Sequence, residues 1–130
     1  MTKLTWDETD FLVCLGVIPE IEDYGTSFCY TLERQGLVLI LTVTPYEGVI
    51  ELQLRRKDSN LNLVSLCLLV GGAVEYKCEK WGKYLQLPSC RIVTSRFYYQ
   101  YERSNDEIGH STLLDVEIIV DPDIRIECGR

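Results

Sequence analysis

The amino-acid sequence predicts a mainly β protein: a strongly curled antiparallel sheet, sandwich-like or a partly open barrel, with one short N-terminal helix. Most of the chain consists of short segments that alternate apolar and polar residues or are dense in branched residues, which is the pattern of strands. Helical spacing occurs once, near the N-terminus. A flat sheet is not expected from roughly seven to nine strands in so short a chain, because large sheets curl or split into two layers.

The length indicates one domain, residues 1–130, around one core, since 130 residues leave little room for a second core. No run of eighteen or more uncharged apolar residues is present, so no membrane span is expected. The first ten residues are acidic and polar, unlike a secretory signal. We therefore expect a cytoplasmic protein.

The helix is expected to begin at a capping box. In this motif the Thr5 hydroxyl accepts from the amide of residue 8 while Glu8 reaches back. Apolar residues then recur on one helical face. That stripe consists of Phe11, Cys14 and Leu15. Gly16 suits the left-handed residue that ends a helix, and Pro19 prevents continuation. A helix of about ten residues is too short to be stable alone, so it must pack on the sheet.

Strand patterns fill most of the remaining chain. They lie at residues 27–34, 37–43, 49–55, 61–69, 74–78, 84–87, 91–101 and 113–120, with a short last strand around 124–126. The 61–69 segment is apolar on both faces, which is typical of a central or covered strand. The hairpin formed by 37–43 and 49–55 is dense in apolar residues and is expected in the core. Its turn is the exposed part, so Tyr46 and Glu47 are candidate contact residues.

The six cysteines are spread along the chain without a CxxC pair, and we expect them to be thiols. Four of them have apolar neighbours and should pack as small apolar side chains. These are Cys14, Cys29, Cys67 and Cys78. Zinc fits poorly because the single histidine, His110, has no cysteine within ten residues. No metal or cofactor is therefore expected. Cys78 and Cys90 are the pair expected to approach one another across a hairpin.

The formal net charge is −7, and it is uneven along the chain. Residues 1–52 sum to −7, residues 53–103 to +5, and residues 104–130 to −5. Nucleic acid is an unfavourable partner for an acidic protein, because phosphate binding needs a basic surface. An acidic face built from both ends of the chain would instead attract a basic protein.

Two side-chain groups resemble catalytic pairs, and for both a surface role is the better interpretation. His110 lies in a polar loop near carboxylates and serines, but no nucleophile motif accompanies it. Asp115 and Glu117 lie on one face of a strand, about 7 Å apart at Cα. That spacing could suit glycoside hydrolysis or a cation site, but polar residues on the solvent face of a strand look the same. We expect no enzyme.

Two aromatic features are candidate interface elements. In the run RFYYQY, Phe97, Tyr99 and Tyr101 are expected to face the core, leaving Arg96 and Tyr98 at the surface. An aromatic platform for single-stranded nucleic acid is the alternative, which the acidic composition disfavours. Arg and Tyr are enriched at interface hot spots. Trp81, at the tip of the hairpin EKWGK, either folds back on its hairpin or is held out to a partner, and folding back is favoured.

Three functions fit these observations, and the first is preferred. It is a small acidic protein-binding module of the immunity or inhibitor type that covers a basic partner. The second is a small-molecule-binding protein or enzyme with a cavity in the curled sheet. The third is a structural subunit whose sheet edges pair into a homodimer or larger homo-oligomer. The expected interface residues are Tyr46, Glu47, Trp81, Arg96, Tyr98, Asp115 and Glu117.

Overall fold

A computed structural model describes residues 3–59, 61–93 and 113–129. These residues form one nine-stranded antiparallel sheet, a short α-helix and two single 3₁₀ turns. The helix is α1 (Glu8–Leu15), and the turns are η1 (Asp23–Gly25) and η2 (Pro45–Glu47). The strands are β1 (Glu20–Glu22), β2 (Ser27–Arg34), β3 (Leu37–Thr44), β4 (Val49–Arg56), β5 (Asn62–Val70), β6 (Glu75–Glu79), β7 (Gly82–Val93), β8 (Leu114–Asp121) and β9 (Arg125–Gly129).

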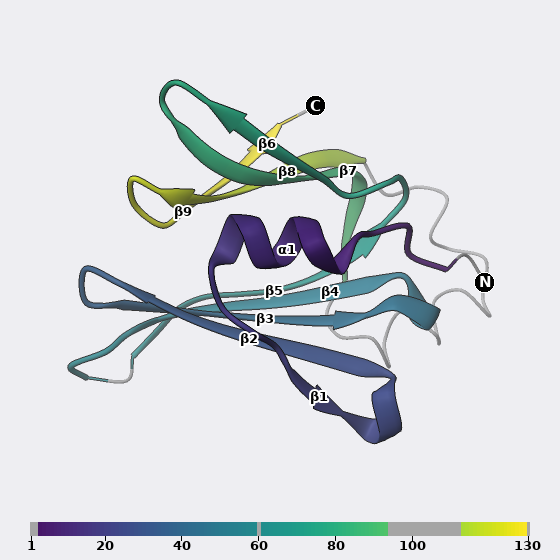
Figure 1. Ribbon diagram of the computed structural model, residues 1–130, viewed down its shortest axis with the longest axis horizontal. Coiled ribbons are helices and arrows are strands. Elements are labelled where there is room, and N and C mark those ends of the chain that lie inside the picture. Colours follow the sequence, from purple (N-terminus) through teal and green to yellow (C-terminus); the bar gives the residue numbers. More distant parts are fainter. Residues whose placement is uncertain (1–2, 60, 94–112, 130) are drawn as a thin grey trace.

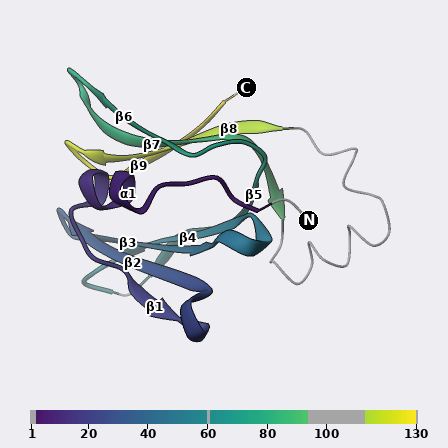
Figure 2. The same cartoon turned by 45° about the vertical axis from the view of Figure 1, so that its right-hand side comes forward.

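The sheet curls into two layers and is not closed into a barrel. The strand order is β1-β2-β3-β4-β5-β7-β8-β9, with β6 also paired to β7. Strands β1–β5 form one layer and β6–β9 the other (Figures 1 and 2). Strand β7 joins the layers, because its first half pairs with β6 and its last four residues, 90–93, pair with β5. The predicted fold class, a curled antiparallel sheet with one short helix, is confirmed.

A bulge in β7 marks the place where the strand passes between the layers. The β7–β8 register shifts between Leu87 and Cys90, and Ser89 has a left-handed backbone with φ 54°. The Ser89 amide donates to Asp115 Oδ1 at 3.0 Å. Gly71 packs against this bulge so closely that a Cβ there would lie 2.6 Å from the Ser89 carbonyl oxygen. Because any larger residue would clash with this carbonyl oxygen, only glycine fits at position 71.

Helix α1 lies between the two layers (Figures 1 and 2). It buries Phe11, Cys14 and Leu15, which confirms the predicted stripe, and Gly16 ends it with φ 72°. The predicted capping box is wrong. Asp7 is the N-cap and its side chain accepts from the Thr9 amide at 2.8 Å. Thr5 does not begin the helix because its carbonyl accepts a hydrogen bond from the amide of Val74. This bond holds the residues before the helix next to the segment that leads into β6.

The core fills the space between the layers. It combines α1 side chains with the inward residues of both layers, among them Tyr30, Leu41, Ile50, Leu85 and Ile118, each no more than 1% exposed. Trp6 packs edge-on against Phe11 and Phe28. The N-terminal segment therefore contacts β2 through Trp6 and, through Thr5, the residue that precedes β6.

Most strand predictions are confirmed to within a residue or two, with two corrections. The strands expected at 84–87 and 91–101 are parts of one longer strand, β7, and the expected strand beyond residue 93 lies outside the described residues. Strand β1 is absent from the predictions. Strand β5, expected to be central, does lie between β4 and β7. Within the described ranges, no helix is long and apolar enough to cross a membrane.

All six cysteines are free thiols, as expected; the predicted apolar packing is confirmed for Cys14 and Cys67 and is wrong for Cys78. Cys14, Cys67 and Cys90 are buried, Cys29 is half-buried, and Cys78 and Cys128 are exposed. The predicted approach of Cys78 to Cys90 is wrong, because Cys78 pairs across the hairpin with Lys83. Cys78 lies instead near Cys14, and Cys128 near Cys90, close enough to influence their pKa values.

Candidate protein-binding surface

Exposed apolar side chains concentrate between residues 12 and 24. Eleven large hydrophobic residues are exposed in the described part of the chain, and five of them come from this short segment. They are Leu12, Val13, Ile18, Ile21 and Tyr24. Together with the acidic residues Glu8, Asp10, Glu20 and Glu22, we name them the α1–β1 surface. Scattered exposed apolar residues are ordinary, so five of the eleven within thirteen residues of sequence make this segment the first candidate for an interaction site.

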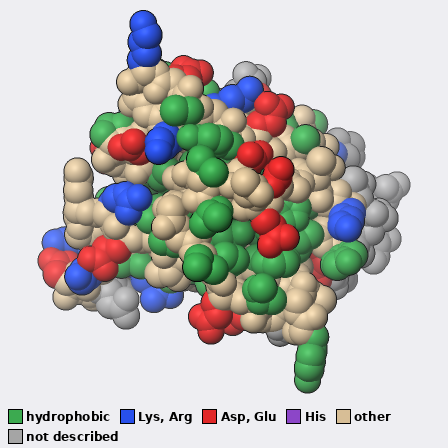
Figure 3. All heavy atoms as spheres, in the orientation of Figure 1, with side chains coloured by type: hydrophobic (Ala, Val, Ile, Leu, Met, Phe, Trp, Pro, Cys, Tyr) green, Lys and Arg blue, Asp and Glu red, His purple; other side chains and the backbone are tan. Residues whose placement is uncertain are grey.

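Within the described residues, the carboxylates of the α1–β1 surface form no ion pair with a cationic side chain. No Lys or Arg occurs between Lys3 and Arg34. None of the ion pairs formed among the described residues involves Glu8, Asp10, Glu20 or Glu22. Figure 3 shows acidic and hydrophobic side chains over the middle of the face that carries α1, with Lys and Arg mostly toward its margins. This surface is therefore acidic and apolar at once.

Strand β1 lies at one end of the strand order, so one of its edges has no neighbour among the strands that the structure describes. All three of its residues are exposed. Ile21 is opposite Phe28 on the inner face, while Glu20 and Glu22 alternate to the outer face opposite Cys29 and Ser27. The edge thus presents an apolar side chain on one face and two carboxylates on the other.

Tyr24, in the turn η1 that follows β1, is the most exposed large hydrophobic side chain among the described residues. Its relative exposure is 108%, and its backbone is left-handed with φ 58° and ψ 35°. This conformation is uncommon for a residue with a bulky side chain and costs free energy. Such strain at an exposed aromatic residue is a basis for inferring a functional role.

The two predicted contact residues at the β3–β4 turn differ in exposure. Tyr46 is 60% exposed, with the Lys3 ammonium 4.8 Å from its ring centroid. Glu47 is half-buried, so it projects less than expected. The turn is held by η2 and by Gly48, whose amide donates to the Pro45 carbonyl. Tyr46 remains a candidate contact residue.

Trp81 folds back on its own hairpin, the favoured of the two expectations. Its ring stacks on Tyr84 at a centroid distance of 5.0 Å, and its indole Nε1 donates to Glu79 Oε2 at 2.8 Å. The Tyr84 hydroxyl donates to the other oxygen of Glu79 at 3.0 Å. One carboxylate therefore fixes both rings, and Trp81 is still 45% exposed.

Asp115 and Glu117 lie on the outer face of the β6–β9 layer with different surroundings. Asp115 accepts from the Ser89 amide and so stabilises the β7 bulge. Glu117 lies in a cross-strand row with Gln86 and Glu127, and Gln86 in turn pairs with Glu75. The structure places Trp81, Asp115 and Glu117 in this one layer, and Tyr46 and Glu47 in the other. Arg96, Tyr98 and His110 lie outside the described residues.

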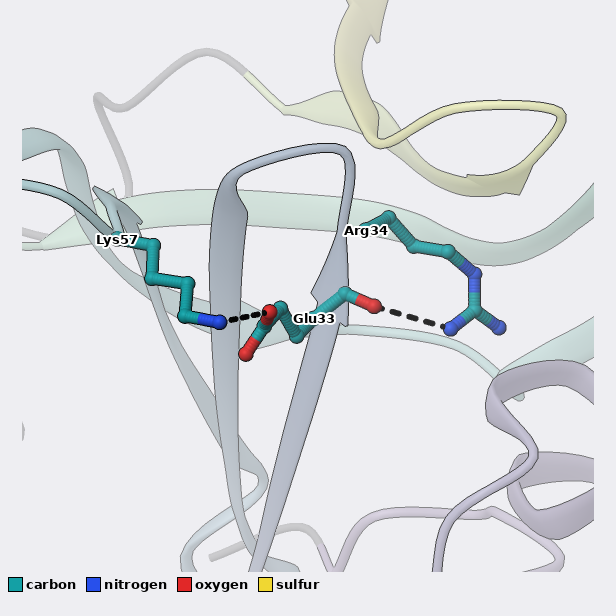
Figure 4. Close-up of polar contacts among 3 residues, drawn as sticks. All are labelled: Glu33, Arg34 and Lys57. Atoms are coloured by element: carbon teal, nitrogen blue, oxygen red, sulfur yellow. Dashed lines mark hydrogen bonds and ion pairs between the residues drawn. The ribbon is translucent and has the colours of Figure 1, made fainter.

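A surface cavity of about 610 Å³ lies between the β2–β3 and β4–β5 turns. It is lined by Gln35, Gly36, Leu37, Arg56, Lys57, Asp58 and Leu63. Its cations already have partners: Lys57 pairs with Glu33 at 2.7 Å, and Arg56 pairs with Asp58 at 3.1 Å. Figure 4 shows Glu33 between Lys57 and Arg34, whose guanidinium donates to the Glu33 carbonyl. This cavity is open and charge-balanced, unlike an enclosed ligand site.

The buried thiols are poor candidates for nucleophiles. Burial raises the pKa of Cys14 and of Cys90 from 9.0 to about 12, which keeps both protonated at neutral pH. Cys90 also donates to the Leu87 carbonyl at 3.2 Å. Among the described residues, no three His, Cys, Asp or Glu side chains gather where a metal ion could bind.

The most exposed part of the α1–β1 surface was not predicted from sequence. The triplet Glu20-Ile21-Glu22 alternates as a strand does, but three residues are too few to distinguish from a loop. The signal available in the sequence was the absence of Lys and Arg over thirty residues that include Ile18, Ile21 and Tyr24.

Comparison with known proteins gives a fold relative and no family. No protein-family model matches the chain. No curated protein matches its sequence. Its fold is similar to that of a chain in the solved contact-dependent growth inhibition toxin–immunity protein complex from Klebsiella pneumoniae 342, with a TM-score of 0.71. The match covers 99% of this chain and 98% of the other, at 20% sequence identity. At that identity the likeness establishes a shared fold.

Proposed function

We propose that this protein is an immunity-type inhibitor that binds a basic protein partner and acts by covering it. The observation that carries the proposal is the α1–β1 surface, where exposed apolar side chains lie among carboxylates that form no ion pair with any described residue. Apolar contacts supply affinity and the carboxylates supply electrostatic attraction to a basic surface. The fold similarity to a chain of a toxin–immunity protein complex supports the same conclusion.

The immunity role fits this chain better than the toxin role. The fold relative comes from a complex of both kinds of protein, so the fold alone supports either. A sequence pI near 4.7 suits a protein that neutralises a basic partner, and it does not suit one that binds nucleic acid phosphates. The buried Cys14 and Cys90, protonated at neutral pH, offer no activated nucleophile.

The other two functions have less support. The space between the layers is occupied by the core and α1, and the described surface cavity is charge-balanced. A homodimer through β1 would bring carboxylates of two copies together across the new strand pair. An inhibitor without enzymatic activity therefore agrees with more of the observations.

Co-expression with a toxin tests the proposal directly. The chain is expressed together with each protein encoded next to its own gene, and bacterial growth is measured. We expect one neighbour to arrest growth alone, and this chain to restore growth and to purify with that neighbour as a complex. If no neighbouring product is bound or neutralised, or if the chain itself arrests growth, the proposal is wrong.

A pair of matched variants locates the contact surface. Ile18 is 82% exposed within the α1–β1 surface, and Leu61 is 54% exposed outside it. Ile18→Ser should weaken the complex by roughly tenfold or more, as removal of an interface anchor does. Leu61→Ser should leave the complex unchanged. Equal effects of the two changes would place the contact elsewhere.

A further inference from the structure

The free edge of β1 has a chemistry that selects what can pair with it. Its inner face carries Ile21, which is 59% exposed, and its outer face carries Glu20 and Glu22. A strand added to this edge would place alternate side chains beside these residues, because side chains of paired strands share a face. The complementary segment therefore has three successive residues that are basic, apolar and basic.

We propose that β1 accepts an extended segment of a protein partner as an additional strand, with two basic side chains beside Glu20 and Glu22 and an apolar side chain beside Ile21. The inference deepens the proposed function, on which the protein nature of the partner rests. Tyr24 continues the contact beyond the strand end. Strand addition to an exposed sheet edge obtains affinity from main-chain hydrogen bonds and specificity from the alternating side chains.

A second copy of this chain is a poor occupant of the same edge. In antiparallel self-pairing centred on Ile21, Glu20 of each copy would be opposite Glu22 of the other; in parallel pairing each Glu would be beside its own counterpart. Like charges directly opposite one another in a sheet are destabilising. The same carboxylates attract a basic segment. Charge thus decides between the two occupants.

The short length of β1 is typical of an edge that is protected from pairing, but its exposed apolar side chains are not. Proteins protect sheet edges by keeping the edge strand short and charged. Protection alone does not need exposed Ile18 and Ile21, nor a strained, fully exposed Tyr24 next to the strand. These apolar side chains would be better replaced by polar ones if the edge were only to remain unpaired.

The experiment is a titration of the isotope-labelled chain with an acetylated and amidated pentapeptide, Thr-Lys-Val-Lys-Thr, followed by amide chemical shifts. We expect shifts at β1 and η1 and slower hydrogen exchange of β1 amides. The matched peptide Thr-Glu-Val-Glu-Thr should not bind. Binding of both peptides alike, or shifts confined to other elements, would overturn the proposal.

Two further controls separate strand pairing from simple charge attraction. In the first, Glu20→Lys with Glu22→Lys should weaken peptide binding about tenfold or more, whereas Glu75→Lys with Glu127→Lys, which changes net charge equally on the other layer, should not. In the second, the peptide is N-methylated either at its valine or at both lysines. One of these two forms must lose binding, because alternate amides point to the edge. Equal binding of both forms would mean that no strand is added.

The outcome is separable from that of the proposed function. Peptide pairing at β1 without neutralisation of any neighbouring protein would leave the edge inference standing and overturn the inhibitor role. If the chain neutralises a neighbouring protein but its β1 amides do not respond to the peptide, the inhibitor role stands and the edge inference is overturned.

Discussion

At the scale of single residues, Tyr24 shows local strain combined with full exposure. Its left-handed backbone is next to Gly25, which has φ 90°, so the turn requires two successive positive-φ residues. Asn, Asp and Gly are the residues that adopt such turns at low cost. A tyrosine at this position therefore lowers stability and presents an aromatic ring to solvent, which is what an interface anchor needs.

Replacing Tyr24 by glycine should separate stability from binding. Tyr24→Gly relieves the left-handed strain, and the free energy of unfolding should be unchanged or up to about 1 kcal/mol higher. Binding to the protein partner should weaken about tenfold or more, because an exposed aromatic anchor is lost. Urea unfolding and a binding titration measure the two quantities. A loss of stability with unchanged affinity would contradict an anchor role.

The buried thiols make stability depend on pH in the alkaline range. Cys14 and Cys90 have pKa values raised by burial from 9.0 to about 12, and Tyr30 has one raised from 10.0 to about 12. A group with a higher pKa in the folded state contributes stability below its unfolded pKa. That contribution is lost as the pH rises toward the folded pKa.

The free energy of unfolding should accordingly be level from pH 7 to pH 8.5 and fall above pH 9. Each thiol lowers the free energy of unfolding by up to about 1.4 kcal/mol per pH unit in that range. Urea unfolding at constant ionic strength measures this slope. In the double variant Cys14→Ala with Cys90→Ala, the free energy of unfolding should begin to fall nearer pH 10, where ionisation of Tyr30 begins to lower it. An unchanged slope in this variant would show that other groups cause it.

At the scale of elements, β7 determines how the two layers meet. Its bulge combines the positive φ of Ser89, the carboxylate of Asp115 and the close approach of Gly71. Bulges bend a strand and re-aim its side chains. Here the bend lets one strand pair with β6 before it and with β5 after it. Asp115 thus stabilises the bulge, and its predicted contact with a partner stays a prediction.

Removing the Asp115 carboxylate should destabilise the fold more than removing that of Glu117. Asp115→Ala leaves the part-buried Ser89 amide without its acceptor and should cost about 1–3 kcal/mol. Asp115→Asn keeps an acceptor oxygen and should cost less. Glu117→Ala, two residues further on the same face, should change stability by no more than about 0.5 kcal/mol. Thermal and urea unfolding compare the three, and equal costs for the two alanine variants would argue against the bulge contact.

At the scale of the whole molecule, the described parts of the two acidic end segments lie at different edges of the fold. Strand β1 lies at the edge of one layer and β9 at the edge of the other, with α1 between the layers (Figure 1). In the C-terminal segment Arg125 pairs with Asp123 and Glu127. The carboxylates of α1 and β1 have no such pairs within the described part of the chain. A basic partner, as proposed above, would therefore be attracted most strongly to the N-terminal part of the chain.

The complex with the protein partner should weaken as salt is added. Between about 50 and 500 mM salt the association rate should fall by roughly one to two orders of magnitude, since screening shortens the reach of exposed charges. Glu20→Gln with Glu22→Gln should show a shallower dependence. Stopped-flow mixing measures both. A rate independent of salt would exclude an electrostatic contact.

Prediction from sequence was accurate where a pattern is long and local. The strands at 27–34, 37–43 and 49–55 have patterns of seven or more residues, alternating in the first and last and densely branched in the middle one, and the structure has them within a residue. The capping box failed because Thr5 has a long-range partner, Val74, that local sequence does not reveal. The Cys78–Cys90 pairing failed because a hairpin register depends on its turn, which here places Cys78 opposite Lys83.

The sequence by itself determined the fold class, the helical stripe, the excess of negative charge at the N-terminal end and the lack of a catalytic motif. These depend on periodicity and composition, which are properties of neighbouring residues. Only the tertiary structure decided that β1 is a free sheet edge, that Tyr24 is fully exposed and strained, and that Asp115 holds the β7 bulge. Exposure, edges and carboxylate partners depend on residues far apart in the chain, which meet only when the sheet curls around α1.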